Sequence, residues 1–153
     1  MENQHGADSG QVKILFALEQ DEDGYPPVNV ENVWARKTSD NFYELDNIPF
    51  YVRGISYKDV VDVARDDEGA LNFKNIVRRS GHSTVRVIVS DLKDRDDLQK
   101  KLEDFACSWE GSNQPSLIAV DIPPEVKLHS VLQFLEKGFE QERWDYEEAF
   151  IAE

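Results

Sequence analysis

Apolar and polar residues alternate along the first half of the chain, as they do in half-buried β-strands. The period of two runs from Val12 to Leu18 and recurs over 30–37 and 42–48. Two further apolar runs, 60–63 and 71–76, flank an acidic turn whose glycine can adopt a positive φ angle. Five strands within about 70 residues predict a small barrel or a curled sheet.

After Ser80 the pattern changes to strands that alternate with amphipathic helices. Strands are expected at 85–89, 118–122 and 144–150. A first helix is expected to carry an apolar stripe from Leu98 to Trp109. A second helix is expected to open at Pro123-Pro124, because proline is tolerated in a first helical turn. Its expected buried face consists of Leu128, Val131, Leu132, Leu135 and Phe139.

These elements predict an α+β protein made of two lobes. A small β-barrel-like lobe over 11–80 is expected to pack on a two-layer β-α-β-α-β sandwich over 81–153, with the boundary near Ser80-Gly81. No linker rich in Gly, Pro or Ser separates the lobes, which favours close packing over tethering. Residues 1–10 are polar, lack the features of a secretion signal and are expected to form a disordered tail.

Net charge is the compositional feature that says most about possible partners. The chain has 31 Asp and Glu against 17 Lys and Arg, a formal net charge of -14, and its basic residues cluster only in pairs. Such a chain repels nucleic-acid phosphates and anionic membrane surfaces, so neither partner is expected. Short apolar runs and a single cysteine indicate a soluble protein of a reducing compartment, the cytoplasm. Acidity that serves solubility alone is the competing interpretation.

Motifs for catalysis, metals and cofactors are not visible. The three histidines include no i, i+4 pair, and the acidic clusters 21–23 and 91–97 lack the glycine and glutamate spacing of calcium loops. No glycine-rich turn joins a strand to a helix, so no phosphate cradle is expected. Cys107 lies beside a predicted buried stripe without basic neighbours, which is typical of packing. The sequence therefore predicts a protein that is not an enzyme and binds neither metal nor cofactor.

Two features remain open to a ligand-binding interpretation. Residues 80–86 combine hydroxyls, an imidazole and a guanidinium just before a strand, although turn and capping chemistry explains them equally well. A pocket between the lobes is the corresponding hypothesis, formed by His82, Arg86 and Phe50. The three tryptophans could form a ligand cage, but core positions are the preferred interpretation for Trp34, Trp109 and Trp144.

Several separate segments resemble a bacterial family, the domain of unknown function DUF4265. In order along the chain, the segments that carry the resemblance are Glu31-Asn32-Val33-Trp34-Ala35, Asn47-Ile48-Pro49-Phe50, Gly54, Asp59-Val60-Val61 and Ser80-Gly81-His82-Ser83-Thr84-Val85-Arg86. The acidic and aromatic ending Trp144-Asp145-Tyr146-Glu147-Glu148 is similar as well. The resemblance implies a small bacterial cytoplasmic protein, of a kind often found as the immunity partner of a secreted polymorphic toxin, and it implies no enzymatic activity.

The leading functional hypothesis is an acidic immunity protein that covers the active site of a basic toxin domain. The alternative is a small-ligand-binding protein or an enzyme with the pocket described above, and a regulatory adaptor is a third, less favoured possibility. The oligomeric state is left open. The residues predicted to contact the protein partner are Asp66, Asp67, Glu68, Asp94, Asp96, Asp97, Glu140, Glu142, Asp145, Glu147 and Glu148.

Overall fold

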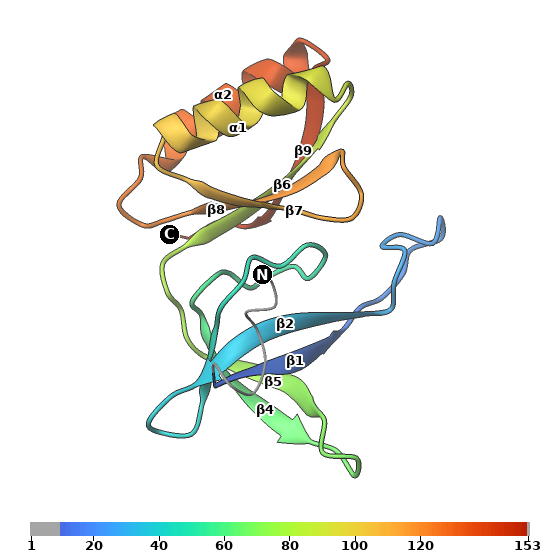
Figure 1. Ribbon diagram of the computed structural model, residues 1–153, viewed down its shortest axis with the longest axis vertical. Coiled ribbons are helices and arrows are strands. Elements are labelled where there is room, and N and C mark those ends of the chain that lie inside the picture. Colours follow the sequence, from blue (N-terminus) through green and yellow to red (C-terminus); the bar gives the residue numbers. More distant parts are fainter. Residues whose placement is uncertain (1–9, 153) are drawn as a thin grey trace. The chain divides into compact units, whose positions relative to one another are not determined.

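The computed structural model describes residues 10–152, and its contacts divide the chain into two compact units, one ending at Ser80 and one beginning at Gly81 (Figure 1). Both strands and helices are present, so the predicted α+β class is confirmed. The expected tail over 1–10 lies outside the described residues except for Gly10, which is part of a turn.

Five strands of the first unit form a closed barrel. They are β1 (Gln11–Ala17), β2 (Val30–Lys37), β3 (Tyr43–Leu45), β4 (Val60–Arg65) and β5 (Leu71–Arg78). Successive strands pair antiparallel, and β1 closes the barrel by pairing parallel with β5. Every strand lies close to an apolar run of the sequence, so the predicted barrel-like lobe is confirmed.

The barrel core follows from the period of two along its strands. Ile14 and Phe16 of β1 are buried, and the ring of Phe16 stacks on Phe73 of β5 with centroids 4.7 Å apart. Trp34 has the opposite phase on β2 from the buried Val33 and is only half-buried, with the ammonium of Lys13 5.2 Å from its ring centroid. The prediction that Trp34 is a core residue is therefore wrong.

The second unit is a four-stranded antiparallel sheet whose two helices cover one face (Figure 1). Its strand order, β7-β8-β6-β9, is the split β-α-β arrangement of ferredoxin-like folds. In chain order its elements are β6 (Ser83–Val89), α1 (Lys93–Asp104), β7 (Ser108–Gly111), β8 (Leu117–Ile122), α2 (Leu128–Glu140) and β9 (Trp144–Phe150). The predicted two-layer sandwich is confirmed, with one strand more than expected.

The additional strand, β7, replaces the predicted last turn of the first helix. That helix ends at Asp104, and Ala106 adopts a positive φ of 67°, which a continuing right-handed helix does not allow. Trp109 still packs against the core, but it does so from β7. An apolar residue at this position fits the phase of a helix and of a strand, which explains the error.

The second helix also begins later than predicted. It starts at Leu128, while Pro123 accepts a hydrogen bond from the Val126 N–H in a preceding turn. Val131 and Leu135 are buried as expected, but Phe139 is 45% exposed, so its assignment to the buried face is wrong. An aromatic residue on the surface of α2 needs another explanation.

Gly138 allows the close approach between α2 and β9. A Cβ atom at this position would lie 2.0 Å from the ring of Trp144, which is buried and donates its indole N–H to the Leu135 carbonyl at 3.0 Å. The glycine therefore does more than weaken a helical turn, because it makes room for the largest side chain in the core of this unit.

Candidate functional site

Two carboxylates, the half-buried Glu31 and the buried Asp59, fix the long connection between β3 and β4 in the first unit. The carboxylate of Glu31 accepts the backbone N–H groups of Phe50, Tyr51 and Val52 at 2.6, 2.9 and 2.9 Å. One side chain from β2 thereby satisfies three backbone N–H donors of this connection. The Glu31 carboxylate therefore stabilises the loop between β3 and β4.

Asp59 performs the same role at the end of that connection. Its side chain is fully buried and accepts the N–H groups of Ser56 and Ser80 at 2.9 and 2.8 Å. The guanidinium of Arg79 lies 3.3 Å from the Asp59 carboxylate and donates to the Gly54 carbonyl at 2.6 Å. Glu31, Gly54, Asp59 and Ser80 all belong to the segments that resemble the family, and here they stabilise one loop.

The predicted acidic turn between β4 and β5 is only partly available for a partner. Asp66 accepts the N–H groups of Glu68 and Ala70, both at 2.9 Å, and its pKa is lowered, first of all by the hydrogen bond from Ala70. Asp66 therefore shapes the turn. Asp67 and Glu68 are exposed to solvent.

The suggestive chemistry at the start of β6 consists of a histidine–carboxylate hydrogen bond and an ion pair, both within the second unit. Nδ1 of His82 lies 2.9 and 3.0 Å from the two carboxylate oxygens of Asp121 on β8. Arg86 stands opposite Glu147 on β9, and its guanidinium donates to the Glu147 carboxylate at 2.8 Å. Glu147 is thus an ion-pair partner as well as a predicted contact residue. Phe50 belongs to the first unit, and a pocket that includes it stays a prediction.

Cys107 is buried between α1 and β7. Burial, assisted by the charge of Asp121, raises the pKa of its thiol to about 11, so the thiol is protonated at neutral pH. Over residues 10–152 no three His, Cys, Asp or Glu side chains are grouped as a metal site would require. None of the helices in the same range has the length and apolar character needed to cross a membrane.

Arg143 neutralises part of the acidic start of α1. Its guanidinium donates from Nε to Asp94 at 2.9 Å and from Nη2 to Asp97 at 3.1 Å, and it lies 5.1 Å from the ring centroid of Trp144. Two of the three predicted contact residues on α1 therefore hold α1 against the start of β9. Asp96 is exposed.

An acidic surface lies where α2 packs against β9. Tyr146 donates its hydroxyl to Glu136 at 2.8 Å, and its ring meets Phe139 edge to face at 6.3 Å. Spacings of three and four residues place Glu136, Phe139 and Glu140 on one face of α2. We call this surface the acidic–aromatic edge and define it by Glu136, Phe139, Glu140, Asp145, Tyr146 and Glu148.

The electrostatics of Tyr146 show that these carboxylates act at one place. Its pKa is raised to about 12, first of all by burial and then by the hydrogen bond to Glu136 and the charges of Glu136, Glu148 and Asp145. Negative charge disfavours a phenolate nearby, so three carboxylates of this surface contribute to the shift beside burial. The same carboxylates attract a cation placed near this hydroxyl.

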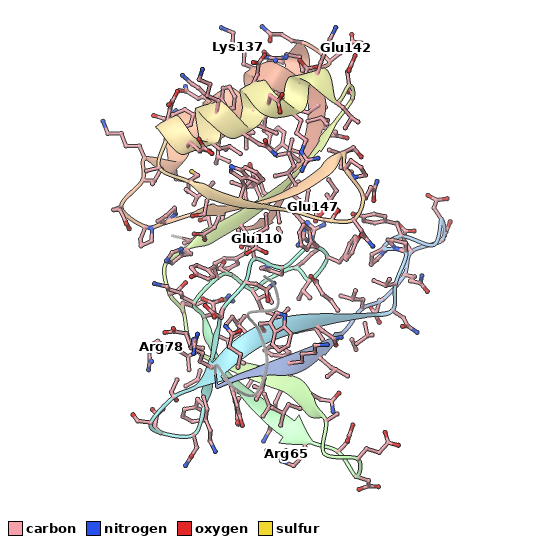
Figure 2. All side chains as sticks on the ribbon, viewed as in Figure 1. Arg65, Arg78, Glu110, Lys137, Glu142 and Glu147 are labelled. Carbon is pink, nitrogen blue, oxygen red and sulfur yellow. The ribbon has the colours of Figure 1, made fainter. Side chains whose placement is uncertain are left out.

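Sequence reasoning found part of this edge and missed the rest. Glu140, Asp145 and Glu148 were predicted as contacts and belong to it, whereas Glu142 is drawn with Lys137 at the helical layer and Glu147 at the sheet (Figure 2). Glu136 and Phe139 were missed. The i, i+3 spacing that joins them was visible in the sequence, but an aromatic residue was assigned to the core by default.

The fold and this surface define a class of small acidic α+β proteins in which a closed barrel is followed by a split β-α-β sandwich. A family model, "Domain of unknown function (DUF4265)", matches residues 31–146, and the chain belongs to this family. The family resemblance seen in the sequence is thus confirmed.

One solved structure has a similar fold. It is described as "Novel crystal structure of a hypothetical protein from Neisseria gonorrhoeae", with a TM-score of 0.80 and 20% sequence identity over 94% of this chain and 96% of that chain. No curated protein matches the chain. At this level of identity the similarity supports the fold alone.

Proposed function

We propose that the protein is an immunity protein that binds a basic toxin domain of a secreted bacterial effector and covers its active site. The observation that carries the proposal is the acidic–aromatic edge. There, exposed carboxylates surround an exposed Phe139 and a Tyr146 whose pKa is raised to about 12. Aromatic side chains at the centre of a charged surface are typical of protein-binding sites.

Charge supports a basic partner in particular. Toxins that cleave nucleic acids need cationic surfaces to hold phosphates, and a cluster of carboxylates offers such a surface a substitute for the phosphate charge. Complementary potentials also raise the association rate, which benefits an inhibitor that must reach the toxin before its substrate does. The charges of Glu136 on α2 and of Asp145 and Glu148 on β9 all raise the pKa of Tyr146.

Coexpression with a basic toxin domain encoded beside the gene tests the proposal. The wild-type chain should restore growth, whereas a chain carrying Glu136→Gln, Asp145→Asn and Glu148→Gln should restore it poorly, because the field at Tyr146 is removed. The matched control carries Glu22→Gln, Asp67→Asn and Glu68→Gln, three exposed acids of the first unit, and has the same net charge. Equal protection by both triple variants would contradict a role for the edge, and absence of protection by the wild type would contradict the function.

The hydrogen-bonded pair of His82 and Asp121 supports the second candidate, a small-ligand-binding protein or enzyme. A carboxylate at 2.9 Å orients an imidazole, as it does in many acid–base and ligand sites. A thermal-shift screen against metabolites and nucleotides tests it. A compound that raises the Tm of the wild type, but not of His82→Gln, would favour this function over the first.

A further inference from the structure

We propose that the basic partner adds an extended, positively charged β-strand to the outer edge of β9. This inference rests on the proposed function, since it specifies how the partner of the acidic–aromatic edge is held. In the sheet order β7-β8-β6-β9, β9 pairs with β6 on one side, and no strand among residues 10–152 pairs with its other side. Its seven residues contain neither proline nor glycine, and its pairing with β6 is regular from Trp144 to Glu148, so this part of the edge is a template for another strand.

The hydrogen-bonding phase shows which backbone groups face outward. The Ser90 N–H donates to the Arg143 carbonyl at 2.9 Å, immediately before β9. Hydrogen-bonded and non-hydrogen-bonded pairs alternate along an antiparallel ladder, and the register continues with Asp145 opposite Ile88. The backbone of Asp145 therefore faces β6, as does that of Glu147 two residues later. The N–H and C=O groups of Trp144 and Tyr146 face the outer edge.

One outward donor already has a temporary acceptor. The Tyr146 N–H donates at 2.8 Å to the side-chain carboxylate of Asp145, its own exposed neighbour. Such a local bond occupies the donor in the absence of a partner. A carbonyl of an added strand can take its place, and the released Asp145 carboxylate then becomes available to a lysine or arginine of that strand.

Charge determines which strand can be added. In an antiparallel pair of two β9 strands centred on Tyr146, Asp145 of each copy would stand directly opposite Glu147 of the other. A shift by one pair in either direction sets Asp145 against Asp145 or Glu147 against Glu147. Like charges directly opposite are destabilising, so a second copy is disfavoured. In a strand with alternating lysines, lysines stand opposite Asp145 and opposite Glu147, which already pairs with Arg86, and the residues between the lysines lie on the sheet face of Tyr146 and Glu148.

A short synthetic peptide of alternating lysine and valine tests this arrangement on the full chain. Amide hydrogen exchange of Trp144 and Tyr146 should slow at least tenfold when the peptide binds. A peptide with the same lysines but proline in place of valine carries equal charge and cannot form the ladder, so it should leave these amides unchanged. The four residues of β7, the other edge of the sheet, provide an internal control and should also be unchanged.

Two variants relate the protection to the charges of β9. Asp145→Lys should weaken binding of the valine peptide about tenfold, whereas Asp96→Lys, an equal change at an exposed site on α1, should weaken it by less than about twofold. Equal protection by the two peptides, protection confined to β7, or protection of Tyr146 that rises with protein concentration alone would each overturn the proposal.

The failure of this inference is distinguishable from failure of the proposed function. In one outcome, a toxin domain binds with the charge dependence described above and leaves the amide exchange of Tyr146 unchanged. That result would contradict the added strand and support the immunity function. Protection of Tyr146 by the valine peptide in a protein that neutralises no toxin would support the added strand and contradict the immunity function.

Discussion

The loop between β3 and β4 and the acidic–aromatic edge use their carboxylates differently. In the first unit Glu31 and Asp59 point inward and are saturated by backbone N–H groups, so they determine the course of the loop between β3 and β4. In the second unit Glu136 and Glu148 lie on the surface and concentrate their field at Tyr146. A net charge of -14 therefore does not identify a binding surface until the acids that stabilise the fold are set aside.

The largest expected effect comes from removing an inward-facing carboxylate. Asp59→Ala should lower the free energy of unfolding by about 3 kcal/mol or more, because two buried N–H groups and the Arg79 guanidinium lose their acceptor. Urea denaturation measures the change. The control, Asp67→Ala in the exposed turn, should change stability by less than about 0.5 kcal/mol. Equal effects at the two positions would contradict the distinction between acids that hold the fold and acids that face solvent.

A second substitution tests how the acidic–aromatic edge is supported from beneath. Helix propensity alone predicts that Gly138→Ala stabilises α2 by about 1 kcal/mol. The contact of the new Cβ with the Trp144 ring predicts the opposite, a loss of about 1–3 kcal/mol. Thermal or urea unfolding gives the sign. Stabilisation would mean that Trp144 does not hold β9 against α2 as described.

The outward-facing carboxylates should contribute little to stability. The triple variant Glu136→Gln, Asp145→Asn and Glu148→Gln should differ from the wild type by less than about 1 kcal/mol in unfolding free energy. Its Tyr146 hydroxyl keeps an amide acceptor at position 136. A strongly destabilised variant would show that these acids stabilise the fold, as Glu31 and Asp59 do.

The smallest effect is spectroscopic and concerns Tyr146. Its pKa is raised from 10.0 to about 12, so the folded state disfavours the phenolate. This contribution to stability is complete below pH 10 and is lost as the pH rises through about 12. Ultraviolet titration should find one tyrosine with this late midpoint, and Glu136→Gln should lower the midpoint. An unchanged midpoint would show that Glu136 does not contribute to the field.

The sequence predicts the strands of this protein better than the ends of its helices. A period of two identifies a strand wherever one face is buried, as from Val12 to Leu18, because the pattern reflects a local rule. The short strand β7 was missed because Trp109 fits either period over so few residues. The exposed position of Phe139 could not be predicted, since its neighbour Tyr146 comes from the next element.

The sequence predicted that the candidate site is acidic, but it did not predict which acidic residues form it. The acidic residues of β9 were found from the sequence. The structural roles of other acidic residues depend on contacts with residues far along the chain. Arg143 binds Asp94 across 49 positions, and Glu31 meets Phe50 across 19. One sequence gives no local signal for such pairs, so it could not separate acids that hold the fold from acids that face a partner.

The association rate with the basic toxin domain, measured at low and high ionic strength, tests the central claim most directly. We expect the wild-type rate to fall at least tenfold between ~0.05 and ~0.5 M salt, because surface charges separated by more than a Debye length are screened. The triple variant of the acidic–aromatic edge should bind more slowly at low salt, and its rate should approach that of the wild type at high salt. Rates that are independent of salt, or equal for the wild type and the triple variant at low salt, would contradict the claim.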